Sequence, residues 1–115
     1  MSSATLVWVY HGKEYRRVPD LDPSQVILMI SNGCDGVSQL ISYVTNKVLA
    51  VNDYKGITAR IYRGSDEYLV HFIVNLANGS DEVIVLVSRN PADTLFNYYT
   101  SLSSENIIEC NYGGR

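Results

Sequence analysis

The sequence predicts an α+β domain in which an antiparallel or mixed sheet of about five strands packs with two or three helices. Three observations support this fold class. Two β-branched runs flank an Asn-Gly pair, a stripe of apolar residues at helical spacing precedes them, and a segment opened by Asn-Pro follows them. The expected order of elements is β-β-(α)-α-β-β-β-α-(β), where brackets mark elements whose type the pattern leaves open.

The strongest of these observations is the hairpin around Asn78-Gly79. The apolar runs Tyr68–Leu76 and Val83–Val87 lie on either side of it. Asn-Gly favours a type I′ turn, because both residues tolerate the positive φ that this turn requires. Ile57–Tyr62 alternates apolar and polar residues, and it predicts a further strand before the hairpin.

A second hairpin is predicted at the N-terminus. Thr5–Tyr10 is strand-like, Gly12 lies in a turn, and Glu14–Val18 returns as a more polar strand. Pro19 ends this pair, since proline cannot donate a hydrogen bond to a sheet.

The segment after this hairpin begins like a helix. Asp22 suits the N-cap position, Pro23 suits the first turn, and Gln25 completes a capping box. Val26–Ser31 is then a short helix or a buried strand, and so short a run does not distinguish the two.

A longer helix is predicted from Asp35 onward. Its apolar residues recur in steps of three and four, which gives one buried stripe. They are Val37, Leu40, Ile41, Val44, Val48 and Val51. Polar residues and Gly56 then end the helix.

The last predicted helix begins with Asn90 as its cap and Pro91 in its first turn. We expect one face of it to carry Ala92, Leu95, Phe96, Tyr99 and Leu102. Asn106–Cys110 is a possible final strand. Residues 111–115 are polar and rich in glycine, so we expect a flexible tail.

Composition limits the function classes. A chain of 115 residues fits one domain, 1–115. Lys and Arg number 9 against 12 for Asp and Glu, a net charge of −3 that argues against nucleic-acid or anionic-membrane binding. The longest apolar run, Val26–Ile30, is too short to span a bilayer. With no secretory signal and two widely spaced cysteines, the sequence predicts a reduced, cytoplasmic protein.

The order of a strand pair, a helix, three meandering strands and a closing helix resembles the longin, roadblock and profilin-like group. The stretches RGSDEYLVHFIV and VIVLVSRNP are similar to the third-to-fifth strand region of longin or roadblock domains. PAS-like sensor domains share the order as well. Roadblock domains begin with a helix, whereas this chain opens on a strand. The resemblance implies a fold and assigns no functional residue.

Catalytic candidates are few. Cys34 lies between two glycines at a predicted helix start, where the thiol pKa is lowered, and His11 or His71 could serve as its base. A packing role for Cys34 is the preferred interpretation. We expect His71 to be a partly exposed residue of the sheet. With only 2 histidines, the sequence predicts no metal site, and it predicts no cofactor.

The tyrosines favour a binding role. The chain has 9 of them, more than one core needs, and tyrosine and arginine are enriched at protein interfaces. Two mixed groups stand out on predicted strands. They are Tyr15, Arg16 and Arg17 on the second strand, and Arg60, Tyr62 and Arg63 on the third.

We therefore expect a non-catalytic module that binds another protein as an adaptor or inhibitor. Its contact surfaces would be a sheet edge and these Tyr/Arg strand faces, and a homodimer is possible. Two alternatives are a PAS-like domain that senses a small ligand and a small enzyme that uses Cys34.

Overall fold

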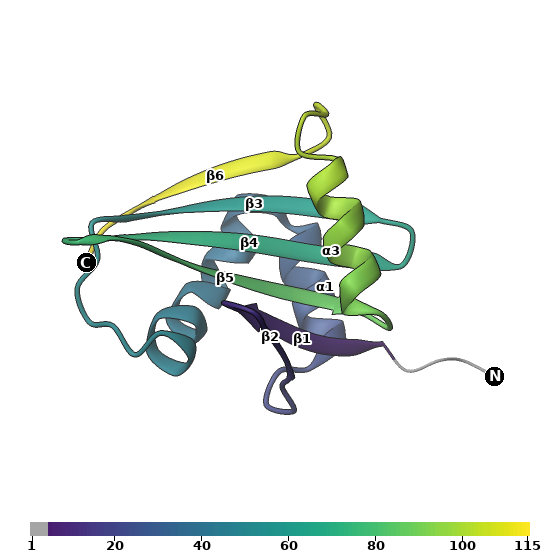
Figure 1. Cartoon of the computed structure of the whole chain (residues 1–115), viewed down its shortest axis with the longest axis horizontal. Helices are drawn as coiled ribbons and strands as arrows, with labels where there is room; N and C mark the ends of the chain where they lie inside the picture. Colours follow the sequence, from purple (N-terminus) through teal and green to yellow (C-terminus); the bar gives the residue numbers. More distant parts are fainter. Residues whose placement is uncertain (1–4) are drawn as a thin grey trace.

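The computed structural model describes residues 5–115 and contains one antiparallel sheet of six strands in the order β2-β1-β5-β4-β3-β6 (Figure 1). This confirms the α+β class, with one strand more than expected. The strands are β1 (Leu6–His11), β2 (Glu14–Arg17), β3 (Gly56–Gly64), β4 (Glu67–Leu76), β5 (Gly79–Ser88) and β6 (Ile108–Gly113).

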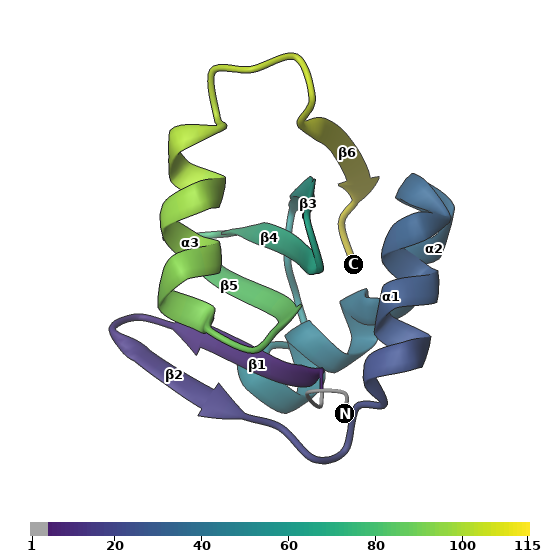
Figure 2. The same ribbon diagram turned by 90° about the vertical axis from the view of Figure 1, so that its right-hand side faces the viewer.

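Helices cover both faces of the sheet, as Figure 2 shows. One face carries a helical segment composed of α1 (Pro23–Ser31), α2 (Gly33–Val37), the 3₁₀ turn η1 (Ser38–Leu40) and the π-helical turn η2 (Tyr43–Val48). The other face carries α3 (Pro91–Thr100). No helix in the described range is long and apolar enough to cross a membrane.

Both predicted hairpins form, but the turn between β4 and β5 differs from the expected one. Leu76 pairs with Gly79, so Ala77 and Asn78 occupy the turn. Gly79 has a φ of 136°, whereas Asn78 does not adopt a positive φ. Gly79, the first residue of β5, thus provides the positive φ. The turn itself lies one residue earlier than predicted.

The first helical segment resolves the alternative that the sequence left open. Val26–Ser31 lies in α1, and Asp22 caps it by accepting a hydrogen bond from the Ser24 amide at 3.0 Å. Val26 and Ile30 are buried four residues apart, on the side that packs against the sheet.

The apolar stripe of the next helical segment is confirmed. Val37, Leu40 and Val44 are fully buried in the core. The winding changes from α to 3₁₀ to π along this stripe, and the helix ends after Val48 rather than at Val51. Ala50 has a φ of 54°, a left-handed conformation that stops a helix.

Two apolar clusters lie on opposite faces of the sheet. The larger one packs the helices α1 to η2 onto alternate residues of the strands, including Val9, Ile57, Phe72 and Val85. The smaller one, under α3, consists of Leu69, Ile84, Leu86, Leu95 and Tyr98. Side chains of β4 alternate between these clusters, with Phe72 on one face and Leu69 and His71 on the other.

The apolar face that the sequence predicts for α3 is not the face that the helix buries. Asn90 caps the helix as expected, by accepting a hydrogen bond from the Asp93 amide at 3.2 Å. The buried residues, however, are Thr94, Leu95 and Tyr98. Of the five residues on the predicted apolar face, only Leu95 is buried, and the other four are exposed to solvent.

The C-terminal segment is also different from the tail that the sequence suggested. Asn111–Gly113 belongs to β6 and pairs with Gly56–Thr58 of β3. Beyond the strand, the backbone of Arg115 exchanges two hydrogen bonds with that of Tyr54, at 2.8 and 3.0 Å. Backbone hydrogen bonds hold this segment in the sheet, although its side chains are mostly polar or glycine and show no strand pattern.

Candidate functional site

The two predicted Tyr/Arg groups lie far apart in the sheet. Tyr15, Arg16 and Arg17 lie on β2, which forms one edge, and β1, β5 and β4 separate this strand from β3. Tyr15 and Arg17 pair with Tyr10 and Trp8, so they project to the α3 face, whereas Arg16 projects to the other face.

The second group is divided between the faces as well. Arg60 and Tyr62 project to the α3 face. There Arg60 lies 3.6 Å from Glu109, and Tyr62 donates a hydrogen bond to Glu67. The guanidinium of Arg63 lies 5.9 Å from the centre of the Tyr68 ring. The six residues therefore form no single binding surface.

The structure instead exposes a group of aromatic rings between α3 and the β1–β2 hairpin. The exposed fractions are 69% for Phe96, 48% for Tyr99 and 42% for Tyr15. The Tyr15 ring lies 5.0 Å from that of Tyr10, and Phe96 and Tyr99 are neighbours three residues apart on the helix. We call Tyr10, Tyr15, Phe96 and Tyr99 the aromatic face.

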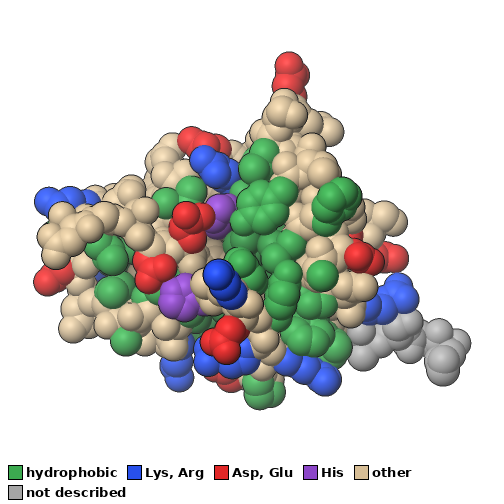
Figure 3. Space-filling model, in the orientation of Figure 1, with side chains coloured by type: hydrophobic (Ala, Val, Ile, Leu, Met, Phe, Trp, Pro, Cys, Tyr) green, Lys and Arg blue, Asp and Glu red, His purple; other side chains and the backbone are tan. Residues whose placement is uncertain are grey.

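Figure 3 shows this side of the molecule. Hydrophobic side chains form a patch over α3 that extends toward the strands beneath it, and the two histidines of the chain lie at its margin. Exposed apolar patches of this kind are typical of sites that contact another macromolecule.

Polar contacts on the opposite side of α3 explain why the helix leaves these rings in solvent. Glu67, at the start of β4, accepts a hydrogen bond from Thr94 at 2.9 Å and from Asn97 at 3.1 Å. Tyr62 donates to the same carboxylate at 3.1 Å. This anchor fixes the rotation of α3, so Tyr98 points into the sheet and Phe96 points away from it.

A hollow of about 290 Å³ adjoins the aromatic face. It lies between the β1–β2 turn, the start of β5 and the end of α3. Its lining consists of Tyr10, Gly12, His71, Ser80, Asp81, Glu82, Ile84 and Tyr99. Sequence patterns do not reveal this hollow, since its residues come from four separate elements and a turn.

His71 lies at the floor of this hollow and not in the partly exposed position that we predicted. Only 4% of its side chain is exposed, because α3 covers it. The Tyr98 hydroxyl lies 2.7 Å from Nδ1, and an oxygen of Glu82 lies 2.6 Å from Nε2. Both ring nitrogens therefore have a partner.

These contacts fit a neutral imidazole. Tyr98 can donate its hydroxyl proton to Nδ1, while Nε2–H donates to the Glu82 carboxylate. Burial lowers the pKa of His71 below 6.5, although the Glu82 carboxylate partly opposes this shift and Arg60 adds to it. Burial also raises the pKa of Tyr98 to about 12, so its hydroxyl keeps the proton that it donates.

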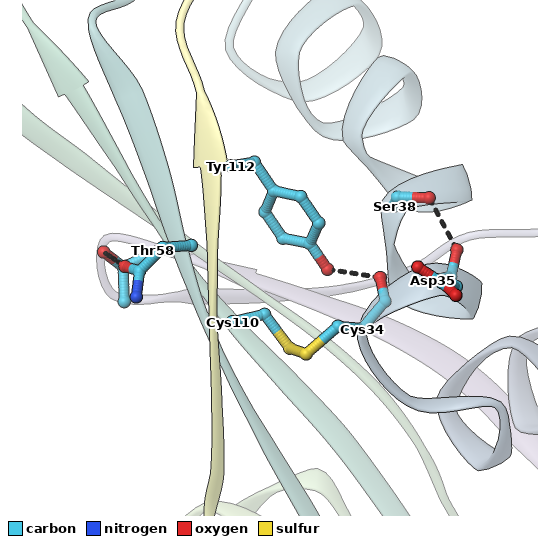
Figure 4. Close-up of a disulfide and its surroundings, with 7 residues drawn as sticks. Cys34, Asp35, Ser38, Thr58, Cys110 and Tyr112 are labelled. Atoms are coloured by element: carbon cyan, nitrogen blue, oxygen red, sulfur yellow. Dashed lines mark hydrogen bonds between the residues drawn. A yellow bond between two sulfur atoms is a disulfide. The ribbon is translucent and has the colours of Figure 1, made fainter.

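Cys34 is not a free thiol. It forms a disulfide with Cys110, which joins α2 to β6 across 76 residues of chain (Figure 4). Tyr112 lies beside the bond and donates a hydrogen bond to the Cys34 carbonyl at 2.6 Å. Among the described residues no free cysteine remains, so the proposed thiolate nucleophile has no counterpart in this structure.

The sequence offered only one clue to this disulfide, which is that the two cysteines are the only ones in the chain. Their pairing depends on β6 lying beside β3 below α2, an arrangement that spacing along the chain does not predict. Within residues 5–115, no group of three or more His, Cys, Asp or Glu side chains could hold a metal ion.

Comparisons with known proteins give no further guide to function. No protein-family model, no curated protein and no solved structure matches this chain. The function must therefore be inferred from the aromatic face, the hollow beside it and the fold that positions them.

Proposed function

We propose that this chain is a non-catalytic domain that binds another protein through the aromatic face. The observation that carries the proposal is the 69% exposure of Phe96 on a helix whose apolar core contacts are already made by Leu95 and Tyr98. Burying an aromatic ring in an interface removes a large apolar area from water at a low cost in side-chain entropy.

Of the six residues chosen from the sequence, this surface includes Tyr15, but its other members are rings that the sequence analysis did not select. Tyr15 belongs to the aromatic face, and Arg17 lies on the same side of β2. The exposed edges β2 and β6 remain possible sites for strand addition by a partner. An adaptor and an inhibitor would both use such a surface, and a second copy of the chain is one possible occupant.

The compartment is part of this proposal. The sequence suggested the cytoplasm, but disulfides persist mainly in oxidising compartments. The bond between Cys34 and Cys110 therefore favours an oxidising location over a cytoplasmic one. The ligand-sensing alternative remains a prediction that no observation here favours.

A photo-crosslinking experiment tests the proposal. A photoreactive phenylalanine analogue at position 96 is expected to capture one protein from an extract of the source in fixed stoichiometry, and Phe96→Ser is expected to abolish the copurification of that protein. Leu28 provides the matched control, because it is 55% exposed on a helix of the opposite face. Light scattering on the purified chain measures its mass in solution, so it shows whether the captured protein is a second copy or a different protein. Equal capture from positions 28 and 96, or none from position 96, contradicts the proposal.

A further inference from the structure

The hollow beside the aromatic face has the size of a site for one side chain. Its volume of about 290 Å³ lies just below the range for ligand pockets, roughly 300–1,000 Å³. It is also partly open to solvent along its rim, where Glu82 and Ser80 are exposed. A large cofactor would not fit, whereas a protruding side chain would.

The lining has the chemistry that attracts a cation. Tyr10 and Tyr99 belong to its lining, and so do the acidic residues Asp81 and Glu82. Aromatic faces attract guanidinium and ammonium groups, and carboxylates form charge-assisted hydrogen bonds with them. No Lys or Arg belongs to the lining.

Glu82 is held in place before any ligand arrives. His71 contacts one of its oxygens at 2.6 Å, yet 58% of the Glu82 side chain is exposed. Tyr98 in turn fixes the ring of His71 from α3. The carboxylate is thus oriented by a buried network and remains accessible, which lowers the entropy cost of binding.

Asp81 is held less firmly than Glu82, because its histidine partner is exposed to solvent and that of Glu82 is buried. His11 lies 3.1 Å from Asp81, and both side chains are more than two-fifths exposed. This contact is weak in solvent, so an incoming cation can replace it. Glu82 is thus the oriented acceptor of the hollow, and Asp81 adds a second negative charge beside it.

We propose that the hollow binds a basic side chain, preferably arginine, from the partner protein that covers the aromatic face. This inference rests on the proposed function and adds the chemistry of the partner. The planar guanidinium can stack between tyrosine rings and donate two parallel hydrogen bonds to a carboxylate, which an ammonium group cannot do. The net charge of −3 also attracts a basic partner over a longer range.

The proposal has a consequence for protonation, because a bound cation and a proton on His71 compete for the same carboxylate. The groups that face His71 are Glu82 from β5, Arg60 from β3, and Tyr98 from α3. Of these, only Glu82 favours the imidazolium. Occupancy of the hollow should therefore lower the pKa of His71 further, and acid should weaken binding.

The test uses the amide of N-acetyl-arginine as the probe and NMR of the whole chain as the readout. Titration is expected to shift the amide signals of Tyr10, residues 80–82 and Tyr99, and to move the titration curve of His71 to lower pH. The amide of N-acetyl-citrulline has nearly the same shape but no charge, so it should bind at least tenfold more weakly. Equal binding of the two probes contradicts the proposal.

Two variants localise the site. Glu82→Gln should weaken binding of the arginine probe roughly tenfold, since it removes a charge-assisted bond. Glu105→Gln removes the same charge from a distant loop and should have little effect. Tyr99→Leu should also weaken binding while it keeps an apolar side chain there. The spectra report whether each variant is folded, and unchanged affinity of both hollow variants overturns the proposal.

This inference and the proposed function can fail separately. If Phe96→Ser abolishes capture of the partner while Glu82→Gln leaves it intact and the arginine probe does not bind, the function stands and the inference is wrong. If the arginine probe binds the hollow but position 96 captures nothing, the hollow is a cation site and the proposed function is wrong.

Discussion

On the face covered by α1, α2 and η2, the sheet packs against a large cluster of apolar side chains that a disulfide ties to the edge strand β6. Under α3, a cluster of only five residues lies beside a buried histidine and a carboxylate network. Of the buried polar residues in the described range, His71, Ser88 and Thr94 lie on the α3 side and Thr45 lies on the other.

This difference suggests that one face of the sheet provides stability and the other provides a binding surface. Apolar burial contributes most of the free energy of folding, so the larger cluster holds the sheet together. The α3 face can then tolerate polar groups in its interior and apolar rings on its surface, both of which lower stability. A surface suited to binding can exist here because the opposite face provides the stability.

The comparison predicts its largest effect for truncation of the large core. Phe72 is fully buried there, and Phe72→Ala should lower the free energy of unfolding by about 3–5 kcal/mol. Leu95→Ala, in the small cluster under α3, should cost about 2–3 kcal/mol, because the site lies at the edge of the cluster and can relax. Urea denaturation followed by circular dichroism measures both. If Leu95→Ala lowers the free energy of unfolding as much as Phe72→Ala or more, the larger cluster is not the main source of stability.

The disulfide should have the next largest effect. The double substitution Cys34→Ser with Cys110→Ser should lower the free energy of unfolding by about 2–4 kcal/mol, since it releases a closure that spans 76 residues. The measurement is again urea denaturation, with and without a reductant. A reductant should destabilise the natural chain to a similar extent and leave the double variant unchanged. If the reductant acts equally on both, the bond contributes no stability.

The smallest effect concerns acid and His71. Burial lowers the pKa of this histidine in the folded state below 6.5, so the unfolded chain takes up the proton first. The stability that depends on neutral His71 is therefore present above pH 6.5 and is lost as the pH falls toward the lower pKa of the folded state. Thermal melts between pH 5 and 8, in steps of about half a pH unit, should show this loss.

The control for this experiment is the other histidine. His71→Gln should remove the pH-dependent loss that this residue causes, whereas His11→Gln, at an exposed position, should leave it in place. A pH profile that His71→Gln does not alter would show that the α3 face tolerates its buried histidine in either protonation state.

Local patterns were sufficient to predict most of the elements. Asp22 and Asn90 cap the helices that they were expected to cap, because capping depends on residues within one turn. The stripe through Val37 and Val44 also predicted the buried side of its helix. In these segments, local propensity and tertiary packing favour the same structure.

The failures have a common cause, which is that distant residues decided the outcome. Glu67 fixes the rotation of α3 through Thr94 and Asn97, so the more apolar side of the helix was not the buried one. The Cys34–Cys110 pairing depends on the position of β6 in the sheet. Tyr15 was chosen from the sequence and lies in the aromatic face, and its role in binding stays a prediction.

The missing parts of the candidate site have the same explanation. Pattern alone put Phe96 and Tyr99 on one face of a helix without saying what that face contacts, and it placed His71 near the surface, where the structure buries it. The hollow combines residues from β1, its turn, β4, β5 and α3. The residues that line it can be identified only once the order of the strands in the sheet is known.

The disulfide between α2 and β6 also divides the chain topologically. It closes a covalent ring that contains β3, β4, β5 and α3, while β1, β2 and α1 lie outside it. Under tension applied at the ends of the described range, only the segments outside the ring can lengthen. The N-terminal hairpin can peel away from β5 and lengthen, whereas the backbone inside the ring cannot be extended until the bond is reduced.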